Sequence, residues 1–220
     1  MDTTEWGPSG WPLFHAIAYY HDHYEEEKGK KNIRVFFKSM QHILPCIYCR
    51  RSYRQYIQEM PVPSVNLFEW SYHLHNKVND KLRKQGYNCH RDPSFDTVLK
   101  TYKQFFSKKK NCTEMGWKFL YSIIFNYDEG ISMTRKKGYI TFFYLLGEVL
   151  PNERSREKYN QYMEKNPIED CMETSDQLKK WMYSLEKTFK SKCCSYKKRC
   201  QSIEKYKVNK CSGKTCRNTL

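Results

Sequence analysis

The chain has 220 residues, a formal net charge of +15, ten cysteines and 16% aromatic residues. It is long enough for one large or two small domains with a hydrophobic core, but no run approaches the roughly 20 apolar residues that span a membrane. Its start lacks the basic and apolar segments of a secretory signal peptide. Because stable disulfides are rare in reducing compartments, ten cysteines without such a signal favour metal binding or redox chemistry.

Apolar residues at three- and four-residue steps predict a first helix that follows the turn-rich segment 6–11 and ends at the acidic run 25–27. His15 lies on or beside the apolar face of this helix. It is either a satisfied core histidine or a ligand contact. A second helix, capped by Asn32, delivers the chain to Cys46.

A third helix begins at a C-x-x-C pair, Cys46 and Cys49, directly after Pro45. Side chains at i and i+3 of a helix lie about 5–6 Å apart, within reach of a disulfide. The unpaired N–H groups of the first turn and the following Arg50 and Arg51 favour a thiolate. Redox chemistry, half of a zinc site and a structural disulfide all stay open. A thioredoxin-type fold is disfavoured because no βαβ pattern surrounds the pair.

A fourth helix, capped by Ser64 or Asn66, carries His75 and Asn79 one turn apart, near Leu82. Polar groups beside apolar ones suit a ligand that has a flat ring and hydrogen-bonding edges. An ordinary amphipathic surface helix has the same pattern. No segment shows the alternation and hairpin turns of strands, so the predicted class is all-α.

Three motifs stand in order along residues 6–98. They are Trp-Gly-x-x-x-Trp-x-x-x-His ending at His15, Pro-Cys-x-x-Cys ending at Cys49, and His-Asn-x-Val-Asn-x-Lys-Leu ending at Leu82, followed by Cys89. Together they resemble the Erv/ALR family of FAD-dependent sulfhydryl oxidases. The resemblance implies a four- or five-helix bundle that binds FAD non-covalently.

The resemblance also implies a reaction, in which two thiols and O₂ give a disulfide and hydrogen peroxide. Thiol-bearing proteins would be the substrates, O₂ the electron acceptor, and no metal is expected. Cys46 and Cys49 would be the catalytic residues, with Cys49 as the flavin-proximal thiolate and Cys46 exchanging with incoming thiols. The implied cofactor-binding residues are Gly7, Trp11, His15, Cys49, His75, Val78, Asn79, Lys81 and Lys84. Exchange between thiols and a disulfide needs only the cysteine pair, but passing electrons to O₂ requires a redox cofactor.

The chain departs from the family pattern after the fourth helix. Many family members join the cysteine at the position of Cys89 to a cysteine at the position that Tyr72 occupies here. Cys89 therefore either pairs elsewhere, with Cys112 as the nearest candidate, or stays free.

An offset of 106 residues aligns the second half of the chain with the first and indicates an internal duplication. It places Trp117 over Trp11, 142–143 over 36–37, and 150–151 over 44–45. The second copy lacks the cysteines and histidines to which the first copy owes its predicted redox chemistry. Asn152 and Ser155 replace the cysteine pair, Tyr121 replaces His15, and Glu186 and Lys190 replace His75 and Asn79 after a further shift of five. The alternative is a coincidence of helical periodicity.

We therefore predict a catalytic domain over 1–104, a degenerate Erv-like helical domain over 112–190 and a basic, cysteine-rich tail over 191–220. Family members commonly form homodimers through their first two helices. The second copy would take the partner's place and make the chain a pseudo-dimeric monomer, with a homodimer as the alternative.

Between residues 187 and 217 the sequence has 11 Lys or Arg and one acid, Glu204. Such a composition does not support a core of its own. Cys211 and Cys216 would serve as a shuttle that carries electrons to the C-x-x-C pair; a zinc site and an unstructured basic tail are the alternatives. The basic charge favours weak electrostatic contact with nucleic acid.

Two other functions compete with the oxidase. One is a basic, zinc-dependent nucleic-acid-binding protein that uses Cys46, Cys49 and the tail thiols as ligands, and the other is a scaffold without turnover. The lack of a signal peptide favours a location like that of the oxidases of large DNA viruses, in the host cytoplasm or virion. The cytosol and the mitochondrial intermembrane space are the alternatives.

Overall fold

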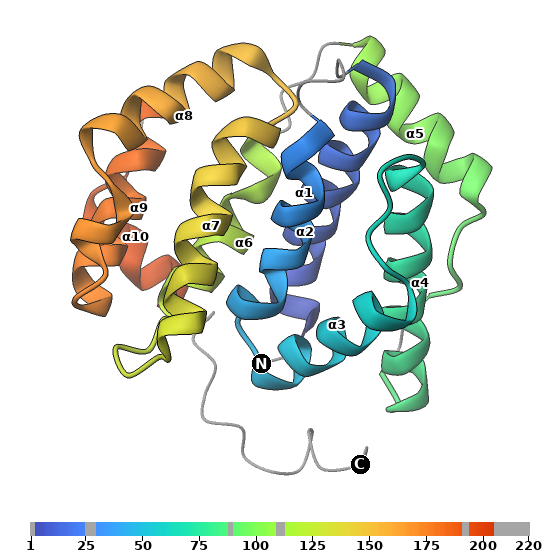
Figure 1. Ribbon diagram of the computed structural model, residues 1–220, viewed down its shortest axis with the longest axis horizontal. Helices are drawn as coiled ribbons and strands as arrows, with labels where there is room; N and C mark the ends of the chain where they lie inside the picture. Colours follow the sequence, from blue (N-terminus) through green and yellow to red (C-terminus); the bar gives the residue numbers. More distant parts are fainter. Residues whose placement is uncertain (1–2, 25–29, 88–89, 109–112, 191–193, 205–220) are drawn as a thin grey trace.

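The structure is a computed structural model that describes residues 3–24, 30–87, 90–108, 113–190 and 194–204 (Figure 1). These residues form helices and contain no strand, which confirms the predicted all-α class. The helices are α1 (Thr3–Tyr24), α2 (Lys30–Ile43), α3 (Ile47–Glu59), α4 (Leu67–Lys84), α5 (Phe95–Ser107), α6 (Thr113–Phe125), α7 (Met133–Val149), α8 (Glu153–Lys165), the 3₁₀-helix η1 (Ile168–Cys171), α9 (Ser175–Phe189) and α10 (Tyr196–Ile203). None of the helices in the described ranges is both long and apolar enough to cross a membrane.

Helix α1 begins earlier than the sequence predicts and runs through Pro8 and Pro12, so the turn predicted for 6–11 is helical. The reason is tertiary packing. Trp6 and Gly10 of this segment are buried, and a Cβ on Gly10 would lie 3.1 Å from Cδ2 of Phe119 in α6. Burial against another helix outweighs the low helix propensity of Gly and Pro.

The next three helices lie close to where they are predicted, because their apolar spacing and the prolines between them set their limits. The predicted cap of α2 is wrong, since Asn32 lies inside this helix, which already includes Lys30. Asn66 precedes α4 as predicted, but it has a left-handed backbone, with φ of 56°, and its side chain makes no capping bond. Asp22 of α1 accepts a hydrogen bond from the Phe68 N–H instead, at 2.7 Å. A side chain from a distant helix therefore does the capping.

The chain folds as two similar halves whose first two helices pack face to face. Helix α1 lies against α6 and α2 against α7, at the centre of the molecule, with α3–α5 on one side and α8–α10 on the other (Figure 1). The rings of Phe36 and Phe142, counterparts at the 106-residue offset, stack across this interface with centroids 5.0 Å apart. A pair of equivalent residues in mutual contact is what a two-fold axis produces.

Glycine contacts at the interface are reciprocal as well. A Cβ on Gly10 would meet Phe119, and a Cβ on Gly116 would lie 2.7 Å from Cδ2 of Leu13. Gly116 and Phe119 are the counterparts of Gly10 and Leu13. The interface therefore has the symmetry of a dimer, inside one polypeptide.

Hydrogen bonds within each half repeat at the same offset, which supports the predicted duplication. The Tyr53 hydroxyl donates to the Phe37 carbonyl at 2.8 Å, and the Tyr159 hydroxyl donates to the Phe143 carbonyl at 2.7 Å. The bond of Arg50 to Leu44 also repeats at this offset, as Arg156 to Leu150. The bond of Trp70 to Met60 and its ring contact with Phe37 repeat for Trp181 with Asn166 and Phe143, where Trp181 follows the further shift of five.

Part of the segment predicted as a tail is ordered on the second half. Helix α10 packs against α6 and α9, with Ile203 buried. The basic composition of 191–220 does not predict this helix, because the helix is stabilised by apolar contact with α6 and α9 and not by a core of its own. The predicted shuttle cysteines, Cys211 and Cys216, and the candidate pair Cys89 and Cys112 lie outside the described residues.

Candidate active site

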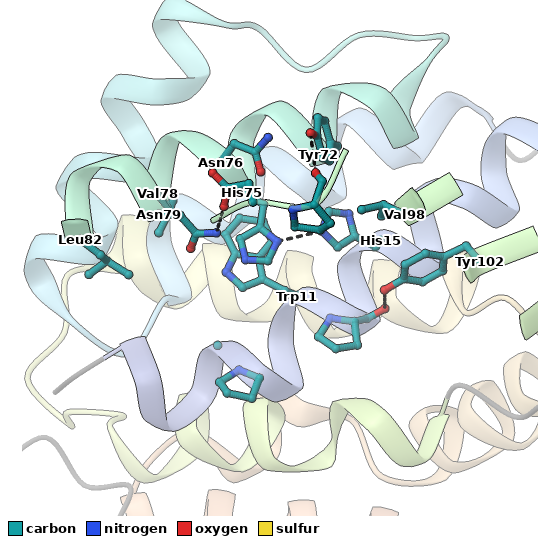
Figure 2. Close-up of a pocket in the computed structure, with 15 residues that line it drawn as sticks. Trp11, His15, Tyr72, His75, Asn76, Val78, Asn79, Leu82, Val98 and Tyr102 are labelled. Atoms are coloured by element: carbon teal, nitrogen blue, oxygen red, sulfur yellow. Dashed lines mark hydrogen bonds between the residues drawn. The ribbon is translucent and has the colours of Figure 1, made fainter. Parts of the chain in front are cut away.

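A cavity of about 400 Å³ opens between α1, α4 and α5 (Figure 2). Six of the nine predicted cofactor-binding residues line it: Gly7, Trp11, His15, His75, Val78 and Asn79. The rest of the wall is Pro8, Pro12, Tyr72, Asn76, Leu82, Asp92, Pro93, Val98 and Tyr102. The volume falls in the range of small-molecule and cofactor pockets. The two separated motifs thus come together on one cavity.

Flat rings form one wall of the cavity. The rings of Trp11 and His75 stack with centroids 4.1 Å apart and an angle of 10° between their planes. His15 lies behind them, 95% buried. A planar wall of this kind favours a planar, aromatic ligand.

A hydrogen-bond chain fixes the tautomers of the two histidines. Ser71 donates its hydroxyl proton to the Phe68 carbonyl at 2.7 Å, so its oxygen accepts from His15 Nδ1 at 2.8 Å. His15 Nε2 is then unprotonated and accepts from His75 Nδ1 at 3.1 Å. By elimination His75 Nε2 carries a lone pair, which makes it an acceptor for a ligand.

Both histidines are neutral. Burial, with His75 as a second cause, lowers the pKa of His15 from 6.5 to about 3, and burial lowers the pKa of His75 to about 4. Desolvation disfavours the charged form of an imidazole. The pair therefore offers the cavity a neutral, hydrogen-bonded surface at physiological pH.

Acid should therefore weaken the fold through these two histidines. As the pH falls below about 6.5, they bind protons in the unfolded chain but not in the folded one until about pH 4 or 3. We expect His15 alone to lower the free energy of unfolding by about 2 kcal/mol between pH 7 and pH 5. Urea unfolding of the His15→Gln variant should show a flatter pH dependence, whereas the exposed His73→Gln control should follow wild type. Equal slopes for both variants would contradict the expectation.

One end of the cavity is closed by the segment that follows α4. Asp92 accepts hydrogen bonds from Asn79 Nδ2 at 2.7 Å and from Arg83 at 2.6 Å. Burial raises the pKa of Asp92, but the bond from Arg83 and then the bond from Asn79 lower it by more, so the net shift is downward. Tyr72 donates to the Pro93 carbonyl at 2.8 Å. This bond holds the segment after α4 against the helix. In many family members a disulfide from the position of Tyr72 would hold the chain after α4 in a similar way.

The cysteine pair lies at the start of α3. Cys46 occupies the N-cap position and Cys49 lies in the first turn. The Cys49 thiol and the backbone N–H groups of Cys49 and Tyr48 lower the pKa of Cys46 despite its burial. The Cys46 sulfur and burial raise the pKa of Cys49. In the reduced pair these contacts favour a thiolate at Cys46, whereas the resemblance implies a thiolate at Cys49.

Neither cysteine lines the cavity, but α3, which begins at the pair, contacts the cavity helix α4. Lys77 of α4 pairs with Glu59, and Lys81, one turn on, donates to Ser52 Oγ at 2.7 Å. The helices are thus antiparallel. From the Lys81–Ser52 contact, Cys49 is one turn back along α3 and Leu82 is one residue on along α4. Both therefore lie on the same side of this contact, and Leu82 lines the cavity.

Comparison with known proteins identifies the family. A model described as the Erv1 / Alr family matches residues 8–106 and again residues 114–209. The chain belongs to the Erv1/Alr family. Both halves carry the family match, which confirms the repeat of an Erv-like fold.

Three relatives illustrate the match to the Erv1/Alr family. The "Mitochondrial FAD-linked sulfhydryl oxidase ERV1" of Saccharomyces cerevisiae is 34% identical over 40% of this chain and 48% of its own. The "Probable FAD-linked sulfhydryl oxidase R368" of Acanthamoeba polyphaga mimivirus is 32% identical over 36% and 59%, and the "FAD-linked sulfhydryl oxidase" of African swine fever virus is 26% identical over 44% and 85%. The chain spans about half the length of the first two. No solved structure matched.

In the second Erv-like half, Tyr121 and Glu186 stand at the positions of the cavity histidines. The Tyr121 hydroxyl donates to Glu186 Oε2 at 2.7 Å, where His15 contacts His75 in the first half. Glu186 is fully buried and pairs with Lys190 at 2.9 Å and with Arg199 of α10 at 2.8 Å. A buried carboxylate with cationic partners therefore stands where the first half has the ring of His75.

The start of α8 shows the same kind of replacement. Asn152 is its N-cap and accepts from the Ser155 N–H at 3.0 Å and from the Ser155 hydroxyl at 3.2 Å. These residues hold the positions of Cys46 and Cys49. A capping hydrogen bond thus stands where the first half has two thiols.

The remaining predicted site residues lie elsewhere. Lys81 binds Ser52, and Lys84 is exposed at the end of α4. Cys171, Cys194 and Cys200 are free thiols, and within the described ranges no three His, Cys, Asp or Glu side chains gather as a metal site. The described part of the chain therefore gives no support to the zinc alternative.

Sequence reasoning missed the third wall of the cavity, which includes Val98 and Tyr102 of α5. The Tyr102 hydroxyl donates to the Pro12 carbonyl at 3.4 Å. The signal was present, since Ser94 caps α5 and apolar residues follow at helical spacing. The segment of α5 lies beyond the last of the three motifs, so the motifs alone do not predict this helix.

Proposed function

We propose that the chain is an FAD-dependent sulfhydryl oxidase that converts two thiols and O₂ into a disulfide and hydrogen peroxide. The observation that carries this proposal is the meeting of the Trp11–His15 and His75–Asn79 motifs on one cavity, with the cysteine pair at the start of the adjoining helix α3. The names of the relatives support the same activity. Proteins that carry reduced cysteines are the proposed substrates.

The residues that line the cavity fit FAD. The stacked rings of Trp11 and His75 offer a flat wall, His75 Nε2 is an acceptor for an amino or hydroxyl group, and Asn79 and Asp92 form a polar edge. Gly7, Pro8 and Pro12 keep the α1 side open. Lys81 and Lys84 are the proposed cationic residues for the pyrophosphate, since they extend from the same helix.

When bound, FAD accepts an electron pair from a dithiol and passes it to O₂. The cysteines of this chain supply that pair. A substrate thiolate attacks the Cys46–Cys49 disulfide, a second substrate thiol resolves the mixed disulfide, and the pair is left reduced while the substrate gains an S–S bond. Each cycle releases two electrons and two protons, which reduce one O₂ to H₂O₂.

We further propose the roles of the two sulfurs. Cys49, on the same side of the Lys81–Ser52 contact as Leu82, is the sulfur beside the cofactor. Cys46 is the sulfur that the substrate thiolate attacks, and its lowered pKa makes it a good leaving group when the mixed disulfide is resolved. Cys46 is only 3% exposed. Exchange there requires a shift of the exposed turn at Ile47 and Tyr48.

The second half is proposed to have no redox chemistry and to serve as the built-in partner of the first. Helices α6 and α7 cover the faces of α1 and α2, so the chain would act as a pseudo-dimeric monomer.

The proposed activity is tested by oxygen consumption. The purified full chain, reconstituted with FAD and given dithiothreitol, should take up O₂ and form one H₂O₂ for each dithiothreitol oxidised. Heat-denatured chain with the same FAD is the control for free flavin. Uptake no faster than that control would refute the oxidase proposal.

A further inference from the structure

Three large apolar side chains are exposed around the cysteine pair. Ile47 and Tyr48, between the two cysteines, are 47% and 36% exposed, and Met133, the first residue of α7, is 69% exposed. Met133 belongs to the degenerate half. Exposed apolar residues that gather at one place mark sites of protein contact more often than scattered ones do.

The packing of α2 on α7 brings Met133 to this place. The helices are antiparallel: Asn32 Nδ2 donates to Glu148 at 2.5 Å near one end, and a Cβ on Gly138 would lie 2.4 Å from Cβ of His42 near the other. Met133 lies beyond Gly138, past the end of α2, where the chain reaches Cys46. In Figure 1 the start of α7 and the start of α3 lie at the same, lower end of the molecule.

Arginines from both halves surround the same end of α2. Arg135 of α7 donates to the His42 carbonyl at 3.3 Å, and Arg50 of α3 donates to the Leu44 carbonyl at 2.6 Å. Burial, with the charges of Arg54 and Arg135, lowers the pKa of His42. Arg51 is exposed next to them. The cysteine pair is thus framed by cationic groups.

Acidic groups that would neutralise this frame are missing from the parts of α2, α3 and α7 that form it, since Glu59 and Glu148 lie at the far ends of α3 and α7. Residues 30–58 contain seven Lys or Arg and no Asp or Glu, and the first turn of α7 has no acid. The two acids before α7 are engaged elsewhere. Asp128 accepts from the Gly130 N–H, and Glu129 accepts from the Ser175 N–H at the start of α9.

We propose that Ile47, Tyr48 and Met133 together with Arg50, Arg51, Arg54 and Arg135 form a docking rim for an acidic protein segment that bears the substrate cysteines. The inference rests on the proposed function and names its substrate class. Complementary charge speeds encounter and selects partners, and the apolar residues provide the contact itself. The degenerate half thus helps to select the substrate.

Charge also separates this occupant from two others. The chain's own C-terminal segment has 11 Lys or Arg between residues 187 and 217, so the rim would repel it. Nucleic acid has the complementary charge but no use for three exposed apolar side chains beside a cysteine pair. An acidic protein segment satisfies both features.

The test compares two synthetic dithiol peptides that differ only in the residues that flank their cysteines, glutamate in one and lysine in the other. At low salt we expect kcat/KM from O₂ uptake to be at least about fivefold higher for the glutamate peptide. The difference should shrink in about 0.5 M NaCl, where surface charges are screened. Arg135→Gln should lower kcat/KM for the glutamate peptide about threefold or more, mainly through KM, and leave the lysine peptide less affected.

Two further variants make the test decisive. Arg51→Gln removes an exposed rim charge that makes no described hydrogen bond and should act in the same direction as Arg135→Gln. Arg154→Gln, exposed on α8 at the opposite end of the molecule, is the matched control and should keep the wild-type preference (Figure 1).

The outcomes separate the two levels of the proposal. Dithiothreitol turnover with equal rates for both peptides would overturn the rim alone, as would a preference that Arg135→Gln and Arg51→Gln leave unchanged. The rim would also be wrong if these variants weakened binding of a duplex DNA oligonucleotide but not use of the glutamate peptide. Failure to oxidise dithiothreitol would refute the oxidase and the rim together.

Discussion

Replacing Cys49 with alanine is expected to lower the rate of dithiothreitol oxidation at least about a thousandfold, because the pair can then form no disulfide and pass on no electron pair. FAD should stay bound, since Cys49 does not line the cavity that Trp11 and His75 form. Oxygen uptake and flavin absorbance, measured on the same sample, separate lost chemistry from lost cofactor. Cys46→Ala should show the same loss of oxygen uptake and the same retention of FAD.

Cys171→Ala is the matched control for Cys49→Ala. Cys171 is a free, half-buried thiol in η1 of the second half, and its removal should leave the rate within about twofold of wild type. Full activity in Cys49→Ala, or an equal loss in Cys171→Ala, would refute the assigned pair.

The second large effect concerns stability. Phe36→Ala is expected to lower the free energy of unfolding by about 3–5 kcal/mol, because it removes a fully buried ring that stacks on Phe142 at the centre of the molecule. Since that ring belongs to the core shared by the two halves, they should still unfold in one transition. Urea titration, followed by tryptophan fluorescence and by circular dichroism, measures both the loss and the cooperativity.

Phe105→Ala, on α5 and only half-buried, provides the comparison for Phe36→Ala. It removes the same side chain away from the interface between the halves, and its cost should be under about 2 kcal/mol. Equal losses for the two variants, or two separate transitions in wild type, would contradict a shared core.

The sequence predicted what depends on local spacing and on motifs. Apolar periodicity and prolines set the limits of α2, α3 and α4, and the 106-residue offset predicted the second half, whose hydrogen bonds repeat those of the first. Gly7, Trp11, His15, His75, Val78 and Asn79 were predicted as one site, and they line one cavity.

What the sequence did not predict depends on contacts between distant segments. The burial of Trp6 and Gly10 against α6 makes a helix of an expected turn. Asp92 and Tyr102 reach the cavity only because the chain after α4 folds back on it. Arg135 reaches the cysteine pair through the antiparallel packing of α2 and α7, which no local pattern encodes.

The position of the thiols was also only partly foreseen. The Pro-Cys-x-x-Cys pattern predicts both in the first turn of α3, but only Cys49 lies there, and Cys46 is the N-cap that precedes it. Which sulfur is the more acidic depends on the proximity of the two thiols and of the backbone N–H groups of Cys49 and Tyr48 to the Cys46 sulfur. Spacing alone carries no information about that difference.

The most direct test of the account is the number of flavins that the full chain binds. Purified protein, saturated with FAD and freed of unbound cofactor, should show flavin absorbance that corresponds to one FAD per chain, held by the first half, while Tyr121 and Glu186 stand at the positions of the cavity histidines in the second. Two flavins per chain, or none after reconstitution, would contradict it.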